Sequence, residues 1–355
     1  MKISFFDDEP EIYPLQYGGK ARTILNLAKE FSKRKEVEQV TILSRSIFTS
    51  KKQFTKDGIR FISLDDHNTM KWIKKAADES DILNIHCCSF TFPFMKTKAK
   101  KFYFLHDVLI ATADKGSHLD KALGGSFDYV IAPSDYAKDI YEKNSKLLGV
   151  TTKCKVIPRH INEELFEQIS KEDLINRTDT PPLLKRILKK YKHIIFFPSR
   201  PIEEKGGKYI IELAKKMKNK SICVIGPFDN QKNLPVNCIN TKWIESEQLK
   251  YYYSAADVTC NFSLLPESFS QVCIESVYCG TPVVSFGSGN IKYLSKDTKA
   301  ILLCQKNIED IEKKILKAME LKEDPKKIEK EVQSIKNKYN VDTIINQYMK
   351  LYKEG

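Results

Sequence analysis

Two glutamates lie eight positions apart in the apolar stretch LPESFSQVCIESVYCGTPVV, which runs from Leu265 to Val284. If the steps between Glu267 and Glu275 are all helical, the two residues lie about 12 Å apart along the axis at 1.5 Å per residue. That separation exceeds the roughly 5–9.5 Å between the carboxyls that flank a glycosidic bond in glycoside hydrolases. The spacing argues against an acid/base pair and favours two carboxylates that accept hydrogen bonds from hydroxyl groups.

The segment between these glutamates is a candidate anion site. Ser268 is predicted to cap a helix that runs to about Cys279 and ends at Gly280. The backbone amides near Phe269 and Ser270 would then point toward an anion such as a phosphate. A magnesium site is disfavoured, because the sequence contains no DxD motif. Amides flanked by two carboxylates suit a ligand built as sugar, diphosphate, sugar.

Two other groups have residue types that bind phosphate. Gly18 and Gly19 lie in a loop before an expected helix, where glycines allow backbone N–H groups to approach an anion. Arg200 and Lys205 lie in FFPSRPIEEKGG. Arginine offers phosphate oxygens a planar fork of donors, and lysine offers them a compact positive charge. The structural alternatives are a plain turn at Gly18 and Gly19 and two exposed loop cations at Arg200 and Lys205.

Short apolar runs alternate with helical patterns from KISFF at residue 2 to PVVSF at residue 282. This alternation predicts an α/β protein with two Rossmann-like, doubly wound parallel-sheet domains facing a cleft. The expected divisions are an N-terminal domain, a polar linker containing Pro181–Pro182, a C-terminal domain, and a helix that docks back on the N-terminal domain. Their ranges are 1–165, 166–190, 191–335 and 336–355.

Strand ends are where a site facing the cleft should draw its residues. His106 ends the strand-like run YFLHD and becomes a candidate by this position alone, since a lone histidine is ordinarily structural.

Composition limits the classes of function. The formal net charge is +13, but no RNP, zinc-finger or helix-turn-helix pattern accompanies it, so a nucleic-acid partner is not expected. The nine cysteines have no CxxC spacing and predict buried, reduced thiols in a reducing cytosol. The N-terminal residues do not have the pattern of a signal peptide, and no run of 18 apolar residues predicts a membrane span.

Five ordered motifs resemble those of retaining GT-B glycosyltransferases, especially family 4. PESFSQVCIESVYCGTPVV resembles the family's E-x7-E region, and PSRPIEEKGG resembles its G-R-x-x-x-x-K-G segment. VIPRHINEELF is similar to the entry into the linker, YYYSAADVTCNFSLLPESF to the run before the first glutamate, and GGKARTILNLAKEF to the N-terminal glycine segment. The resemblance spans residues 1 to about 295 and implies the GT-B fold.

The resemblance also implies a role for each site residue. Arg200 and Lys205 would stabilise the diphosphate leaving group, as a metal does elsewhere. Glu275 would bind the ribose hydroxyls and Glu267 those of the donor sugar, with His106 beside that sugar. The amides of four residues would hold the phosphates, and two further residues would face the nucleobase. The amides belong to Gly18, Gly19, Phe269 and Ser270, and the residues that face the base are Trp243 and Ile244.

The sequence departs from the family pattern at three points. Ser268 and Ser270 replace glycines of the first motif, which suggests a tighter phosphate loop or additional hydroxyl donors. Arg159 and His160 replace the Asn-Gly pair of the linker entry, so the geometry of that turn is open. The Gly-His pair before the second strand is absent from RKEVEQVTIL.

The leading hypothesis is a metal-independent retaining transferase that moves a hexose from a UDP- or GDP-sugar to a hydroxyl acceptor. A sugar-nucleotide epimerase, a phosphorylase of the same fold and a non-catalytic basic binding module are the alternatives. The nucleotide sugar is expected as a co-substrate, with a glycan, lipid-linked or small-molecule acceptor and no cofactor. We expect a cytoplasmic protein. Peripheral membrane association is an open alternative, suggested by basic and aromatic groups at Lys96, Lys98, Lys100 and Tyr103.

Overall fold

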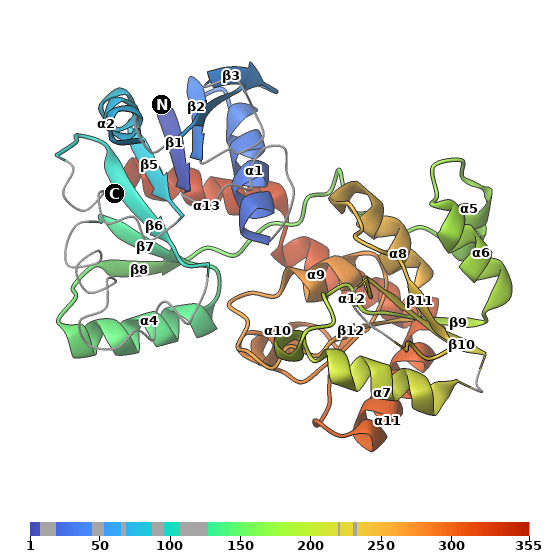
Figure 1. Ribbon diagram of the computed structural model, residues 1–355. Helices are drawn as coiled ribbons and strands as arrows, with labels where there is room; N and C mark the ends of the chain where they lie inside the picture. The colour runs from blue at the N-terminus through green and yellow to red at the C-terminus, as the bar shows by residue number, and fades with distance from the viewer. Residues whose placement is uncertain are drawn as a thin grey trace. The chain divides into compact units, whose positions relative to one another are not determined.

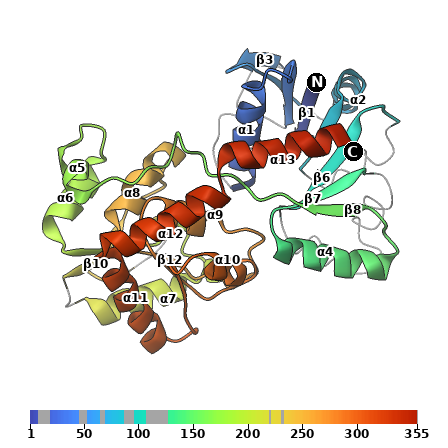
Figure 2. The ribbon, with the colours of Figure 1, turned by 180° about the vertical axis from the view of Figure 1, so that it is seen from behind.

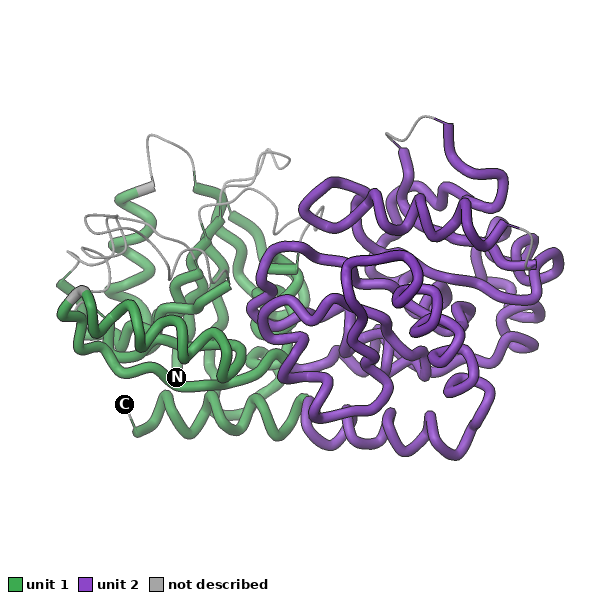
Figure 3. The backbone as a smooth tube through the Cα atoms, turned by 90° about the horizontal axis from the view of Figure 1, so that it is seen from below, with its two compact units in different colours: residues 1–159, 341–355 green, residues 160–340 purple. Residues whose placement is uncertain are grey.

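The chain folds into two compact units. The structure, a computed structural model, describes residues 1–7, 19–44, 53–64, 69–86, 96–106, 127–218, 221–229 and 233–354. Residues 1–159 and 341–355 form unit 1, and residues 160–340 form unit 2 (Figure 3). Each unit contains one sheet in which the strands are mainly parallel.

Unit 1 is built on an eight-stranded sheet with the order β3-β4-β2-β1-β5-β6-β7-β8 (Figure 1). All neighbours pair in parallel except β3 and β4. The central strands are buried on both faces, which explains their continuous apolar sequence. The bounds are β1 Lys2–Asp7, β2 Gln39–Ser44, β3 Gln53–Lys56, β4 Ile59–Ser63, β5 Ile82–Ile85, β6 Lys100–Phe104, β7 Tyr129–Ala132 and β8 Lys153–Val156.

Helices cover both faces of this sheet, as Figure 2 shows from behind. Within the described residues they are α1 (Gly19–Ser32), α2 (Thr69–Glu79), α4 (Asp135–Leu148) and α13 (Val341–Glu354). On one face, Phe6 of β1 belongs to a buried cluster with Ile73 of α2 and Tyr141 of α4. On the other face, Phe31 of α1 packs against Phe5 of β1 and Tyr352 of α13. Alternate side chains of one strand therefore bury two layers of helices.

The last helix, α13, belongs to unit 1 although it is some 180 residues away along the chain. Tyr352 is 2% exposed, and its hydroxyl donates to Asn84 Oδ1 at 2.8 Å. Lys100 Nζ donates to the Tyr352 carbonyl oxygen at 3.3 Å. Lys100 and Tyr103 are two of the four residues that the sequence suggested for a membrane surface. In the structure Lys100 contacts α13 and Tyr103 is 2% exposed, so both have a role within unit 1.

Unit 2 contains a six-stranded sheet with the order β11-β10-β9-β12-β13-β14, in which all pairs are parallel. Its strands are β9 His193–Phe196, β10 Ile222–Gly226, β11 Cys238–Asn240, β12 Val258–Asn261, β13 Val283–Ser285 and β14 Ile301–Leu303. Its helices are α5 Lys171–Asn176, α6 Pro182–Lys190, α7 Gly207–Met217, α8 Leu249–Ala255, α9 Gln271–Tyr278, α10 Ile291–Asp297, α11 Ile308–Lys322 and α12 Pro325–Lys338.

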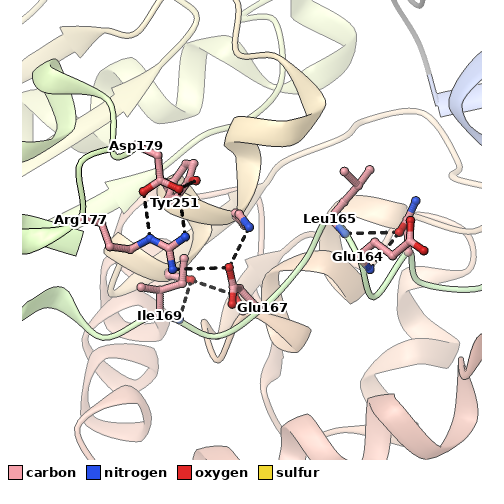
Figure 4. A network of polar contacts seen from close by, with 10 residues as sticks. Glu164, Leu165, Glu167, Ile169, Arg177, Asp179 and Tyr251 are labelled. Carbon is pink, nitrogen blue, oxygen red and sulfur yellow. Dashed lines mark hydrogen bonds and ion pairs between the residues drawn. The ribbon is translucent and has the colours of Figure 1, made fainter. Parts of the chain in front are cut away.

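The segment expected as a linker, 166–190, lies within unit 2 and carries α5 and α6. A polar network fixes it to α8, as Figure 4 shows. Arg177 binds the Asp179 carboxylate through two nitrogens, and the Tyr251 hydroxyl donates to the same carboxylate at 2.7 Å. Hydrogen bonds from Arg177 and Tyr251 hold the pKa of Asp179 well below its usual range. Apolar side chains fix the segment as well, because Leu174 of α5 and Leu184 and Ile187 of α6 are buried.

The boundaries of the units therefore differ from the expected ones. The division falls between Arg159 and His160, and the chain returns to unit 1 at Val341 rather than at residue 336. Helix α12 stays in unit 2, where Val332 and Ile335 are fully buried.

The cysteines resolved as free thiols lie at 154, 223, 238, 260, 273, 279 and 304. Burial raises their pKa, for example that of Cys273 to about 12, so these thiols stay protonated at neutral pH. In the described part of the chain, no helix is both long and apolar enough to cross a membrane.

Tyr352→Phe tests how α13 is held in unit 1. The substitution keeps the ring but leaves the buried Asn84 Oδ1 without this donor, so the free energy of unfolding of unit 1 should fall by about 1–3 kcal/mol. Urea unfolding, with amide exchange in β5 as the local probe, measures the loss. Tyr191→Phe is the control, because the described residues offer its hydroxyl no hydrogen bond. Equal stability of the two variants would contradict this role of the hydroxyl.

Candidate functional site

The first part of the site is the loop between β9 and α7. Arg200 is exposed there, and Lys205 ends a short 3₁₀ turn from Glu203. Gly206 follows in the left-handed region with φ 75°, and a Cβ on it would collide with the backbone of Phe262. The glycine is therefore needed both for its conformation and for the close approach of the loop after β12.

Lys205 is brought directly to Glu267. Its Nζ lies 2.8 Å from Glu267 Oε1, with 40% of the Lys205 side chain and 18% of the Glu267 side chain exposed. Leu264 N donates to the Glu204 carbonyl at 2.8 Å, which ties the loops after β9 and β12 together. Because β9 and β12 are neighbours in a parallel sheet, both loops leave the same edge. Two candidate site residues that are 62 positions apart in the sequence thus form one ion pair.

A third loop, after β13, supports the backbone around Glu267. Asn290 N donates to the Glu267 carbonyl at 2.8 Å, and Asn290 Nδ2 donates to the Phe269 carbonyl at 3.0 Å. Gly289, with φ 64°, forms a bridge with Glu267. Sequence reasoning missed Asn290; its position five residues after the strand VVS is the signal that could have identified it.

Helix α9 begins later than the sequence predicts. The expected cap was Ser268, but the helix starts at Gln271 and Ser270 occupies the N-cap position without a capping side-chain bond. The Ser270 hydroxyl instead accepts from Asn261 Nδ2 at 2.9 Å and donates to Cys273 Sγ at 3.2 Å. Ser270 is 4% exposed, so its hydroxyl is used inside the protein rather than offered to a ligand.

The remaining unit 2 candidates differ in exposure. Glu275 is 4% exposed, and the Tyr253 hydroxyl donates to its Oε2 at 3.3 Å. Trp243 is 43% exposed and Ile244 is 8% exposed, just after β11. Phe269 is buried, and its ring packs edge-on against Tyr339. Trp243 is therefore the aromatic surface open to a ligand, whereas the Phe269 side chain is structural.

Unit 1 gathers a second polar group at the edge where β1, β5 and β6 end. His86 Nδ1 lies 2.7 Å from His106 Nε2, and Arg159 approaches His106 Nδ1 at 3.1 Å. Beside them Lys20 Nζ pairs with Asp7 Oδ1 at 2.9 Å. Sequence reasoning selected His106 alone, although Asp7 and His86 end strands by the same rule.

The histidines of this group are held neutral. Burial is the main reason that the pKa of His86 lies well below its usual range, and the positive charges of Lys20 and Arg159 lower it further. Burial also dominates for His106, with His86, Arg159 and Lys20 adding to the lowering of its pKa. Neither ring therefore carries a charge at neutral pH.

The remaining predictions from the sequence concern glycines and metals. Gly19 is the exposed first residue of α1, and Gly18 lies outside the described residues. Within the described ranges, no three His, Cys, Asp or Glu residues come together as metal ligands.

Ser270→Gly and Ser270→Ala separate backbone strain from hydrogen bonding. Both variants lose the hydroxyl, but only alanine keeps a Cβ at φ 69°, so the glycine variant should be more stable than the alanine variant by about 1 kcal/mol. Urea unfolding gives the difference. At Ser268, which is outside the left-handed region, the order should reverse, with alanine more stable. The same order at both positions would contradict strain at Ser270.

Comparison with known families and curated proteins gives two matches. Residues 184–335 match the family described as glycosyl transferases group 1. An uncharacterized 42.6 kDa protein in the cps region of Klebsiella pneumoniae is 24% identical over 237 residues, which are 66% of this chain and 55% of the relative. The match thus spans about half the length of that relative.

Solved structures resemble the whole chain. Sucrose-phosphate synthase from Thermosynechococcus elongatus superposes with a TM-score of 0.76 at 16% identity, over 99% of this chain and 98% of the other. Anabaena HepE, solved in complex with UDP-glucose, gives a TM-score of 0.77 at 17% identity over all of both chains. The chain therefore has the GT-B fold, and the family match to 184–335 together with these neighbours supports a glycosyltransferase.

Proposed function

We propose that the protein is a retaining glycosyltransferase, similar to family 4, that moves a hexose from a nucleotide-diphosphate sugar to a hydroxyl acceptor without a metal. The observation that carries the proposal is the 2.8 Å ion pair between Lys205 and Glu267, within the segment that matches glycosyl transferases group 1. Arg200 lies in the same loop as Lys205. A UDP-sugar is the first candidate donor, because HepE was solved with UDP-glucose and with UDP.

In this proposal, charge in the loops of unit 2 replaces a metal. Arg200, Lys205 and Glu267 together carry one net positive charge, so the Glu267 carboxylate does not cancel the attraction for a diphosphate. The fork of Arg200 is exposed and able to bind phosphate oxygens through two nitrogens. Lys205 is already oriented by Glu267, which reduces the entropy lost when it contacts the leaving group.

Glu267 and Glu275 act as hydrogen-bond acceptors in the proposed reaction. Glu267 would accept from hydroxyls of the donor sugar, and its pairing with Lys205 would link sugar binding to the phosphate contact. Glu275 would accept from the ribose, which requires the Tyr253 hydroxyl to share Oε2 with the ligand or to leave it. Positive charge near the leaving phosphate contributes mainly in the transition state, where that charge develops.

The acceptor and the place of action remain part of the proposal. A glycan, a lipid-linked carrier or a small molecule is the proposed acceptor. Sequence composition, with +13 net charge, is compatible with peripheral binding to an anionic membrane, but the groups first cited for it are partly buried or engaged. A non-catalytic binding module is the second candidate, and it predicts nucleotide binding without turnover.

Arg200→Ala and Lys205→Ala should each lower turnover about 10²–10³-fold, as removal of one oxyanion-type donor does. The measurement is release of the nucleotide diphosphate from a saturating donor sugar. Lys208→Ala is the matched control, because Lys208 is an exposed lysine of α7 that lies over the Tyr209 ring. Near-normal turnover in both site variants would remove these residues from the mechanism.

A thermal-shift screen with UDP, GDP, ADP and their sugars tests the donor class and the absence of a metal. UDP or a UDP-sugar should raise the melting temperature most, since a ligand at 100 times its Kd stabilises by about 2.7 kcal/mol. The shift should be the same with EDTA. Loss of the shift in EDTA with recovery on adding Mg²⁺ would contradict metal independence, and the absence of any shift would contradict the proposed function.

A further inference from the structure

Arg159 stands where the resembling family has asparagine, and the structure gives it a partner. The residue follows β8, whereas His86 and His106 follow β5 and β6. In the sheet, β7 lies between β6 and β8, so only a long side chain reaches from the end of β8 to the histidines. Arg159 does so with its guanidinium, 3.1 Å from His106 Nδ1.

The directions of these hydrogen bonds follow from the chemistry of the groups. A guanidinium only donates, so His106 Nδ1 must be the unprotonated acceptor. His106 then carries its proton on Nε2 and donates it to His86 Nδ1 at 2.7 Å. If His86 Nδ1 donated to His106 Nε2 instead, the proton of neutral His106 would be on Nδ1, where it would face the N–H donors of Arg159. Both rings are therefore assigned as neutral Nε2–H tautomers.

We propose that Arg159 is a positioning residue that fixes His106 as the neutral Nε2–H tautomer, so that the ring stays uncharged and transfers no proton. Its link to turnover rests on the proposed function and on the family resemblance, which implies that His106 lies beside the donor sugar. Both ring nitrogens are engaged within unit 1, which leaves neither of them as a general base.

A neutral ring suits glycosyl transfer. The transition state resembles an oxocarbenium ion, and an imidazolium beside it would oppose the positive charge that develops on the sugar. Arginine keeps its own charge at every working pH, so the hydrogen bond to Nδ1 does not change with pH. Asparagine at this position has a side chain too short to reach past β7, so it would not hold His106 in one tautomer.

The surroundings of His106 support the same protonation state. His86 faces it from β5 and is stacked between Phe5 and Phe104, which prevents it from turning away. Lys20 of α1 adds positive charge, partly offset by its ion pair with Asp7 of β1.

From α13, Tyr348 stacks on Phe104, and burial raises the pKa of Tyr348, so it remains uncharged. Except for Asp7, which is paired with Lys20, these groups are neutral or cationic and do not stabilise an imidazolium.

The test compares the wild type with Arg159→Met and Arg159→Lys by ¹⁵N NMR of the histidine rings. The chain has six histidines, and His86→Gln and His106→Gln variants assign the two signals. In the wild type, His106 should show a protonated Nε2 and an unprotonated Nδ1 from pH 5.5 to 8. In Arg159→Met it should become a mixture of tautomers, and Arg159→Lys should restore the single tautomer because an ammonium also only donates.

Turnover supplies the functional readout. Arg159→Met should lower kcat about tenfold or more with little change in the KM for the donor, and should add an acid-side loss that the wild type lacks. Arg186→Met, an exposed arginine of α6, is the matched control and should match the wild type. Circular dichroism confirms that each variant is folded.

The outcomes separate the two proposals. An unchanged His106 tautomer in Arg159→Met, or titration of His106 between pH 5.5 and 8 in the wild type, overturns the role of Arg159. If no nucleotide sugar is turned over by the wild type, the proposed function fails, while the NMR result still decides the tautomer.

Discussion

Parallel strand pairing is the constraint on which both candidate groups depend. In a parallel sheet, every loop that follows a strand leaves from the same edge. Residues that are distant in sequence but follow adjacent strands therefore become neighbours. In unit 2 this brings Lys205, after β9, to Glu267, after β12. In unit 1 it brings His86, after β5, to His106, after β6. The sheet supplies the proximity, and the side chains supply the charge and the hydrogen bonds.

Much of this arrangement could be predicted from the sequence, because it follows from where strands end. The alternation of apolar runs predicts both sheets, and the position of Arg200, Lys205 and His106 after such runs predicts the edge on which they lie. The pairing of Lys205 with Glu267 was not predicted, since strand order is set by contacts between strands and not by any one of them. The β3–β4 hairpin was missed although Asp57–Gly58, with φ of 51° and 74°, is a turn that sequence can reveal.

Other features escape sequence reasoning for a physical reason. The segment 166–190 was expected as a linker because it is polar and lacks a strand, yet paired charges and Tyr251 bind it to α8. Ser268 is the predicted cap because serine favours that role, but the helix begins two residues later than predicted, and the Ser270 at its N-cap uses its hydroxyl inside the protein. In both cases a residue type has several uses, and only the tertiary partners decide which is realised.

The two groups use fixed charges in the same way, through a neighbour that restricts what the site residue can do. Glu267 restricts the orientation of Lys205 through their 2.8 Å ion pair. Arg159 restricts His106 to one tautomer, so the ring offers no proton. In each group, the neighbour restricts the geometry of the site residue through a contact within the same unit.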